Sequence, residues 1–366
     1  MLNGEDSEVH DGPSEPRFSP WGRIEPVTSF DVPPLLQALS GQRPQRLPVW
    51  FMRQAGRSLP EYKKVRRGVA MLDACLRPEL AAEITLQPVR RHAVDAAIFF
   101  SDIMTPLKLA EVGVDIVANV GPVIEHPVRN ASDVDALVAH EISDASPISE
   151  AIALVCAELG EATPLIGFAG APFTLAAYLV EGRGTRDHLA ARAMMHADPE
   201  SWRRLLEWCG RISGEFLKVQ VDAGARVVQL FDSWAGSLSR ADYVEHVAPH
   251  SAAALAAVEG RVPRIHFGTG TRHLLGDMAA CGVEAMGIDY RTPLDEAAEA
   301  LPGLPLQGNI DPALLAAGWD ALEAHTRDVV ERGRRAPAHV VNLGHGVPPD
   351  TDPDVLTRLV DLVHSL

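Results

Sequence analysis

Short apolar runs recur along the chain, and each one ends abruptly in polar or glycine-rich residues. In the second half they lie at 226–231, 264–267, 285–288, 304–308 and 339–343. Three more precede them, at 49–52, 96–100 and 165–168. An apolar run of this length bounded by turn residues is typical of a buried strand. The pattern therefore predicts eight strands.

The segments between these runs have helical composition and spacing. Helices are expected at 31–40, 72–91, 134–140, 148–159, 200–223, 239–259, 271–281, 293–301, 311–334 and 352–365. The alternation at 112–120 predicts a small hairpin. Strands that alternate with helices form a parallel sheet. Eight such units predict a single closed (β/α)8 TIM barrel of the α/β class. A doubly wound open sheet is the alternative, although no GxGxxG follows the first strand.

Composition and charge restrict the class of protein. The chain has 366 residues, 46% of them hydrophobic, and a formal net charge of −16. This charge argues against nucleic acid or an anionic membrane as a partner. The uncharged run 162–180 is interrupted by Gly and Pro, so it is interpreted as a strand, a loop and a helix start. Residues 1–25 lack signal-peptide features and are expected to be a disordered tail before a catalytic domain at 26–366.

The cysteines are widely spaced and form no CxxC pair. They are Cys75, Cys156, Cys209 and Cys281. Isolated thiols of this kind predict reduced core residues of a cytoplasmic protein rather than a zinc knuckle or a disulfide framework.

A dense positive loop follows the first predicted strand. Arg53 and Arg57 flank Gly56, and Lys63, Lys64, Arg66 and Arg67 come next. Guanidinium groups bind carboxylates or phosphates in a forked, charge-assisted way. A solvated basic face is the alternative, but the loop begins at a strand end in an otherwise acidic chain. We interpret it as a specific anion site.

Active sites of such barrels lie at the carboxyl ends of the strands. The polar residues expected to meet there are Arg53, Arg57, Asp102, Ser233, Asp289, Asp311 and His345. Asp102 suits either a helix cap or a central functional group, whereas Asp289 and Asp311 are assigned to capping. His345 lies between two glycines, which favours contact with a ligand. Ser233 has no GxSxG context, and Tyr178 taken alone is more typical of a core.

The remaining chemistry motifs do not occur. No lysine directly follows a predicted strand, so Schiff-base chemistry has no obvious residue. There is no HExxH, no Cys/His cluster and no phosphate-binding P-loop, and no two strand-end carboxylates are close in sequence. The residues predict a barrel without a cofactor or a metal, which acts on a polyanionic small molecule.

Several long motifs resemble the uroporphyrinogen decarboxylase family, in the family's order and spacing. They are PVWFMRQAGRSLPEY, FFSDI, GFAGAPFTLAAYLVEG, QLFDSWAG, LQGNIDP and NLGHGVPPDTDP. The resemblance covers 26–366 and implies a (β/α)8 barrel, a homodimer and a cytosolic role in porphyrin and heme biosynthesis. It implies cofactor-free removal of CO2 from the four acetate side chains of uroporphyrinogen III, giving coproporphyrinogen III.

The resemblance also implies roles for residues. Asp102 corresponds to the central carboxylate, and Arg53 shares the catalytic role; which of the two supplies a proton stays open. The residues implied in substrate binding are Arg53, Gln54, Ala55, Gly56, Arg57, Arg66, Asp102, Tyr178, Ser233 and His345. Ser58 departs from the family, which usually has an aromatic residue there.

Two other functions stay open at this point. A zinc- or corrinoid-dependent methyltransferase of the same superfamily would need a His/Cys ligand set, and the sequence offers Cys281 and His345 without a third ligand by spacing. A non-catalytic tetrapyrrole carrier would keep the arginines and could lose Asp102. The presence of Asp102 favours the enzyme.

Overall fold

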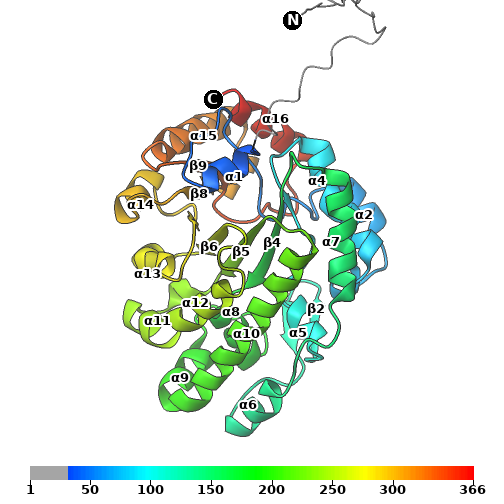
Figure 1. The fold of residues 1–366 in the computed structure, drawn as a ribbon, viewed down its shortest axis with the longest axis vertical. Helices are drawn as coiled ribbons and strands as arrows, with labels where there is room; N and C mark the ends of the chain where they lie inside the picture. The colour runs from blue at the N-terminus through cyan, green and yellow to red at the C-terminus, as the bar shows by residue number, and fades with distance from the viewer. Residues whose placement is uncertain (1–31) are drawn as a thin grey trace, which may run out of the picture. The chain divides into compact units, whose positions relative to one another are not determined.

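A seven-stranded parallel sheet lies at the centre of residues 32–366, which are the residues that the computed structural model describes (Figure 1). Its neighbours are, in order, β1 (Ala97–Ile98), β4 (Leu165–Gly170), β5 (Val227–Asp232), β6 (Arg264–Gly268), β7 (Ala285–Gly287), β8 (Leu306–Ile310) and β9 (His339–Leu343). The sheet curls into a half-barrel with helices between its strands. Because the order never reverses along the sheet, it differs from a doubly wound fold. The prediction of a parallel α/β sheet is confirmed.

The predicted first strand is shorter than expected. Val49 forms an isolated parallel bridge with Val341 of β9. The N–H of Val341 donates to the Pro48 carbonyl at 2.9 Å, and the Asp95 N–H donates to the Val49 carbonyl at 2.9 Å on the other side. The segment thus connects to β9 and to the residues just before β1.

Side-chain acceptors end this pairing after Trp50. The backbone N–H of Met52 donates to Asn342 Oδ1 at 3.0 Å, and that of Phe51 donates to Gln54 Oε1 at 2.9 Å. Neither N–H group is therefore available to pair with a neighbouring strand, and the expected strand at 49–52 does not continue beyond Trp50.

Three of the expected long helices are each two shorter ones. The expected helix at 72–91 is α3 (Met71–Cys75) followed by α4 (Pro78–His92), which begins at its proline. The segment 239–259 contains α11 (Arg240–His246) and α12 (Ala248–Ala256). In 311–334, Gly318 at φ 93° separates the 3-10 helix η3 (Pro312–Ala316) from α15 (Trp319–Gly333). Proline and glycine punctuate these segments, as their backbone preferences dictate.

Most of the other elements agree with the predicted pattern. They are α1 (Pro34–Leu39), β2 (Val114–Val117), β3 (Gly121–Ile124), α6 (Ala131–Val138), α7 (Ser146–Leu159), α8 (Pro172–Glu181), α10 (Pro199–Ala223), η2 (Arg272–Leu274) with α13 (Leu275–Ala279), α14 (Leu294–Ala300) and α16 (Pro353–His364). The pattern did not predict α2 (Pro60–Val65), α5 (Thr105–Leu109), α9 (Leu189–Ala197) or the 3-10 helix η1 (Ala235–Ser237). Strands β2 and β3 form the expected antiparallel hairpin. The uncharged run 162–180 contains β4 and the start of α8, as predicted, and no helix among residues 32–366 is long and apolar enough to cross a membrane.

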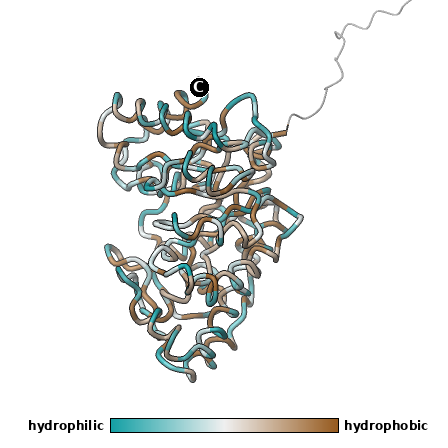
Figure 2. Tube along the Cα trace, turned by 90° about the vertical axis from the view of Figure 1, so that its left-hand side faces the viewer, coloured by the Kyte–Doolittle hydropathy of each residue, from teal (hydrophilic) through white to brown (hydrophobic). Residues whose placement is uncertain are grey.

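Helix α10 shows how the outer helices are anchored. Trp202 and Trp208 are both buried, as expected of core anchors. The alternation of hydrophilic and hydrophobic residues along the outer helices can be followed in Figure 2.

All four cysteines are free thiols; Cys156 is only partly buried, and the other three are in the core. The expected tail at 1–25 lies outside the described residues.

Candidate active site

Arg53 is held at the mouth of the sheet by a strained turn. Its backbone is left-handed, at φ 61°, and its side chain is exposed. The next residue, Gln54, is fully buried. The Gln54 side chain accepts a hydrogen bond from Phe51 N–H and donates to the Ala96 carbonyl at 3.0 Å. The buried Gln54 side chain therefore holds the loop against the core, while the Arg53 side chain faces outward.

The loop after β9 closes against Arg53. The Val347 N–H donates to the Met52 carbonyl at 2.8 Å. A Cβ on Gly346 would lie 2.5 Å from Arg53 Cδ, and one on Gly344 would lie 2.1 Å from the Tyr290 backbone nitrogen. Position 344 therefore requires glycine, because its neighbour is backbone, whereas a side chain at position 346 would displace that of Arg53.

Asp102 begins the turn that leads from β1 to α5. Its Oδ1 accepts a hydrogen bond from the Met104 N–H at 2.9 Å, and its carbonyl accepts one from the Thr105 N–H. Burial raises the pKa of Asp102, while the Met104 hydrogen bond and the Arg53 charge oppose that rise. This contact belongs to the turn before α5, whose N-cap is Met104, so Asp102 does not cap the helix. Asp102 also lies within the field of Arg53.

Tyr178 projects from α8 toward the same charges. Burial and the Asp102 carboxylate raise the pKa of Tyr178 to about 12, against the charge of Arg53. Its ring stacks on Trp234, with centroids 3.9 Å apart, and Trp234 stacks in turn on His188 at 4.3 Å. The phenol is therefore a neutral hydrogen-bonding group supported by an aromatic column.

His345 completes this group at the end of β9. Desolvation lowers its pKa, and the charges of Arg53 and Arg291 lower it further. The imidazole is therefore biased toward its neutral form. Ser233 follows β5 and is half-buried, and its carbonyl accepts a hydrogen bond from the Thr269 hydroxyl.

Four of the five remaining basic residues of the loop line a groove beside the mouth. It has a volume of about 530 Å³ and is lined by Arg57, Tyr62, Lys63, Arg66, Arg67, Pro349 and Asp350. The guanidinium of Arg66 lies 5.3 Å from the centroid of the Tyr62 ring. Ala55 packs against the core, and Gly56 sits close to the Arg53 carbonyl. The groove is strongly cationic, with one acid at its edge.

The two aspartates predicted to cap helices, Asp289 and Asp311, both have structural partners. Asp311 caps η3 by accepting the Ala313 N–H at 2.9 Å, as predicted. Asp289 is buried, accepts the Gly270 N–H at 2.7 Å and pairs with Arg291 at 2.7 Å. Asp289 therefore joins two neighbouring loops rather than capping the next helix.

Comparison with known proteins identifies the family of the chain. The family model described as uroporphyrinogen decarboxylase (URO-D) matches residues 32–366. A uroporphyrinogen decarboxylase of Arthrobacter sp. (strain FB24) is 65% identical over 335 residues, covering 91% of this chain and 97% of the relative. One of Leifsonia xyli subsp. xyli is 57% identical, covering 90% of this chain and 94% of the relative. The chain belongs to the uroporphyrinogen decarboxylase family.

Solved structures support the fold of this family member. A methyltransferase from Methanosarcina mazei aligns with a TM-score of 0.76 over 90% of this chain and 97% of the other, at 20% identity. At that identity the likeness concerns the fold alone.

The two residues that the sequence offered as zinc ligands of a methyltransferase lie in different places. The Cys281 thiol contacts the carbonyls of Ala248 and Asp277, whereas His345 lies at the mouth near Arg53.

Sequence reasoning missed two features of this family member's site. The first is the Trp234–His188 part of the aromatic column, in which neither ring nitrogen of His188 has a hydrogen-bond partner among residues 32–366. The second is a buried pair beneath Ser233, where His266 Nε2 lies 3.7 Å from Asp232 Oδ2. Both depend on contacts between segments far apart in sequence. Only the FDSWAG motif, which contains Asp232 and Trp234, pointed to this region.

Proposed function

We propose that the chain removes CO2 from the four acetate side chains of uroporphyrinogen III and gives coproporphyrinogen III, a step of porphyrin and heme biosynthesis. The observation that carries the proposal is the shared electrostatic environment of Arg53, Asp102 and Tyr178. Arg53 follows the segment paired with β9, Asp102 follows β1, and Tyr178 lies on α8, the helix after β4. The family membership supplies the substrate class.

The cationic rim accounts for recognition of the substrate. Uroporphyrinogen carries eight carboxylates, and Arg53, Arg57 and Arg66 can each bind one in a forked geometry. His345, Ser233 and the backbone of 54–56 border the same loops and complete the binding surface. Because Gln54 is buried in loop contacts, its contribution comes through its backbone and through the position it gives Arg53.

Asp102 accounts for the chemistry. Protonation of the pyrrole carbon next to an acetate arm makes a cationic ring. Cleavage of the bond between the acetate methylene and the carboxylate carbon then releases CO2, and the electron pair of that bond forms an exocyclic double bond that neutralises the ring. A proton then adds to the methylene carbon to make the methyl group, and the ring carbon loses the proton it had gained, which restores the pyrrole. An ionised Asp102 accepts hydrogen bonds from the pyrrole N–H groups and stabilises the cation by preorganised electrostatics. The neutral Tyr178 phenol lies in the same field and can donate to Asp102 or to a substrate carboxylate.

The proton donor is either Arg53 or Asp102. An arginine is a weak acid, with a pKa above about 12. Asp102 stabilises the cation only when it is ionised. The pH dependence of turnover in Arg53→Lys distinguishes them: an unchanged rate and profile would exclude Arg53 from proton transfer.

The finer architecture is part of the proposal. We infer a closed eight-stranded barrel in which 48–51 completes the ring, supported by the Val49–Val341 bridge and the Asp95–Val49 hydrogen bond. We also propose a homodimer that works in the cytoplasm; four unpaired cysteines fit a reducing compartment.

The decisive experiment is anaerobic incubation of the purified chain with uroporphyrinogen III, followed by chromatographic separation of products by carboxylate number. Loss of four carboxylates supports the proposal. Tight binding without any product would instead indicate the tetrapyrrole carrier, and turnover that required a corrinoid would indicate the methyltransferase. Asp102→Asn serves as the matched inactive control.

A further inference from the structure

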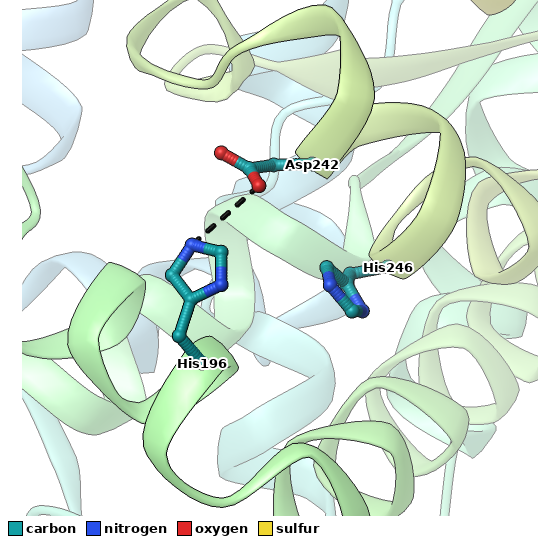
Figure 3. A group of neighbouring side chains, drawn as sticks. All are labelled: His196, Asp242 and His246. Atoms are coloured by element: carbon teal, nitrogen blue, oxygen red, sulfur yellow. Dashed lines mark ion pairs between the residues drawn. The ribbon is translucent and has the colours of Figure 1, made fainter.

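Three potential metal ligands converge at a place that the mechanism above does not use (Figure 3). They are His196, Asp242 and His246, and one ligand atom from each lies within 4.8 Å of the others. His196 Nε2 is 3.5 Å from Asp242 Oδ1, and the two imidazole rings meet edge to face with centroids 6.0 Å apart. Among residues 32–366 this is the one group of three such side chains with that spacing.

The local sequence explains why the ligands meet. Asp242 and His246 are four residues apart in α11, so both lie on one face of the helix. The Ser239 side chain caps α11 by accepting the Asp242 N–H at 3.1 Å, which fixes the turn that carries the carboxylate. His196 comes from the last turn of α9. The cluster therefore joins two helices.

The ligand atoms are not taken up by stronger partners. Arg240 lies two residues before Asp242, but its guanidinium is bound to Asp277 at 2.7 and 2.8 Å. Within the described part of the chain, His196 is the one ion-pair partner of Asp242. For His246 the corresponding acid is Glu245, whose carboxylate is 3.9 Å away and mostly exposed.

We propose that His196, Asp242 and His246 bind a divalent transition metal of the Zn²⁺ class and thereby clamp α9 to α11. Two imidazoles and one carboxylate are the ligands that Zn²⁺ takes when a water fills its fourth position. Mg²⁺ and Ca²⁺ prefer sites made of oxygen ligands.

The site needs only a small adjustment to close on the ion. Ligand bonds of about 2.0–2.2 Å in a tetrahedron place ligand atoms roughly 3.3 Å apart. The side chains therefore have to move inward by about an ångström. The side chain of His196 is 60% exposed, so it can rotate without disturbing the core.

The clamp would act on one wall of the candidate active site. Helix α9 follows the segment that contains His188, and α11 follows the β5 loop that contains Ser233 and Trp234. These are the segments joined by the Trp234–His188 stack. Metal binding would hold α9 and α11, the helices next to the two stacked residues, together. The metal itself would not contact the substrate.

Calorimetric titration of the full chain with ZnCl2 tests the site, with His196→Gln and His246→Gln as variants. We expect one Zn²⁺ per chain and at least a tenfold weaker affinity in each variant. His126→Gln is the matched control, because His126 is a highly exposed histidine beside an acid, Glu125, outside the cluster. Absence of stoichiometric binding, or equal affinity in all four proteins, would overturn the proposal.

Two further readouts separate this site from the thiols and from general stabilisation. The Co²⁺ form should show d–d absorption without a thiolate charge-transfer band; such a band would assign the metal to cysteine and refute the site. ZnCl2 at a concentration that saturates the wild type should raise the Tm of the wild type and of His126→Gln clearly more than those of His246→Gln and Asp242→Asn, while MgCl2 raises none of them. Equal Zn²⁺ shifts in all variants would also contradict the proposal.

Discussion

Arg53 fills the space in which a side chain at Gly346 would begin. A Cβ there would lie 2.5 Å from Arg53 Cδ and 2.8 Å from its Cγ. The glycine loop after β9 therefore determines where the guanidinium can lie, although the two residues are almost three hundred positions apart.

Gly346→Ala should displace the Arg53 side chain and weaken substrate binding. Because a misplaced guanidinium loses its forked contact, we expect KM for uroporphyrinogen to rise about tenfold. Steady-state kinetics measures this change, and Arg53→Ala should remove most of the effect of Gly346→Ala in the double variant. Gly276→Ala is the control, since a Cβ at that position in α13 would meet no atom of the described part of the chain within 4 Å. An unchanged KM in Gly346→Ala would contradict the relationship.

Asp102→Asn should separate stability from activity. The asparagine Oδ1 can still accept the Met104 N–H but carries no charge to stabilise a pyrrole cation. We expect kcat to fall by at least a hundredfold. Near-normal turnover would refute the electrostatic role of Asp102.

The same variant has a predictable effect on stability. Burial raises the pKa of Asp102, so the folded state holds its proton more tightly than the unfolded chain. The wild type therefore loses stability as pH rises from the usual Asp range through the raised pKa. Asp102→Asn cannot lose this contribution, so its Tm at neutral pH should equal or exceed that of the wild type. A clearly lower Tm would show that the charge is needed for folding.

Much of the fold could be predicted because each strand is a compact apolar run that ends at turn residues. Strands β5, β6 and β9 begin within one residue of the predicted position. The segment 49–52 differs because its N–H groups bind the side chains of Gln54 and Asn342. No local pattern reports that Asn342, on another strand, faces Met52.

Some residues of the candidate site could likewise be predicted from the sequence, and others could not. Arg53 and Asp102 could be proposed because strand ends converge in a barrel, and the family motifs added Tyr178. The burial of Gln54 could not be predicted. Its side-chain amide donates to the carbonyl of Ala96, a residue distant in the sequence. The same applies to His188, which the local sequence gives no reason to place on Trp234.

Tyr178→Phe tests the phenol without removing the stack on Trp234. The hydroxyl contributes a hydrogen bond, and its loss should lower kcat/KM about tenfold. Because the pKa of Tyr178 is raised to about 12, the phenol stays protonated throughout the assay range, and the alkaline limb of the rate profile should be the same in both proteins. A limb that moves in Tyr178→Phe would show that Tyr178 titrates. Tyr178→Ala also loses the stack, and its free energy of unfolding should fall by about 2 kcal/mol.

The buried pair below Ser233 predicts a pH dependence of stability. Burial disfavours the charge on His266, but the Asp232 carboxylate outweighs it, together with Cys281, and raises the pKa to about 9. The Asp232 Oδ1 is held by the Thr174 hydroxyl at 3.0 Å, and Oδ2 faces His266. Since a free histidine has a pKa of about 6.5, the unfolded chain binds this proton less tightly. The stabilisation is therefore complete below about pH 6.5 and is lost as pH rises through about 9.

Urea unfolding at pH 6 and at pH 9.5 measures this loss. We expect the wild type to lose on the order of 3 kcal/mol between them, on the scale of about 1.4 kcal/mol for each pH unit between the two pKa values. Asp232→Asn should be destabilised by about 3–5 kcal/mol at pH 6, because it leaves a buried imidazolium without its counter-charge. The same variant should lose much less of its remaining stability at pH 9.5. If the wild type and Asp232→Asn change in parallel, His266 is neutral in the folded protein and the pair does not anchor the β5 loop through charge.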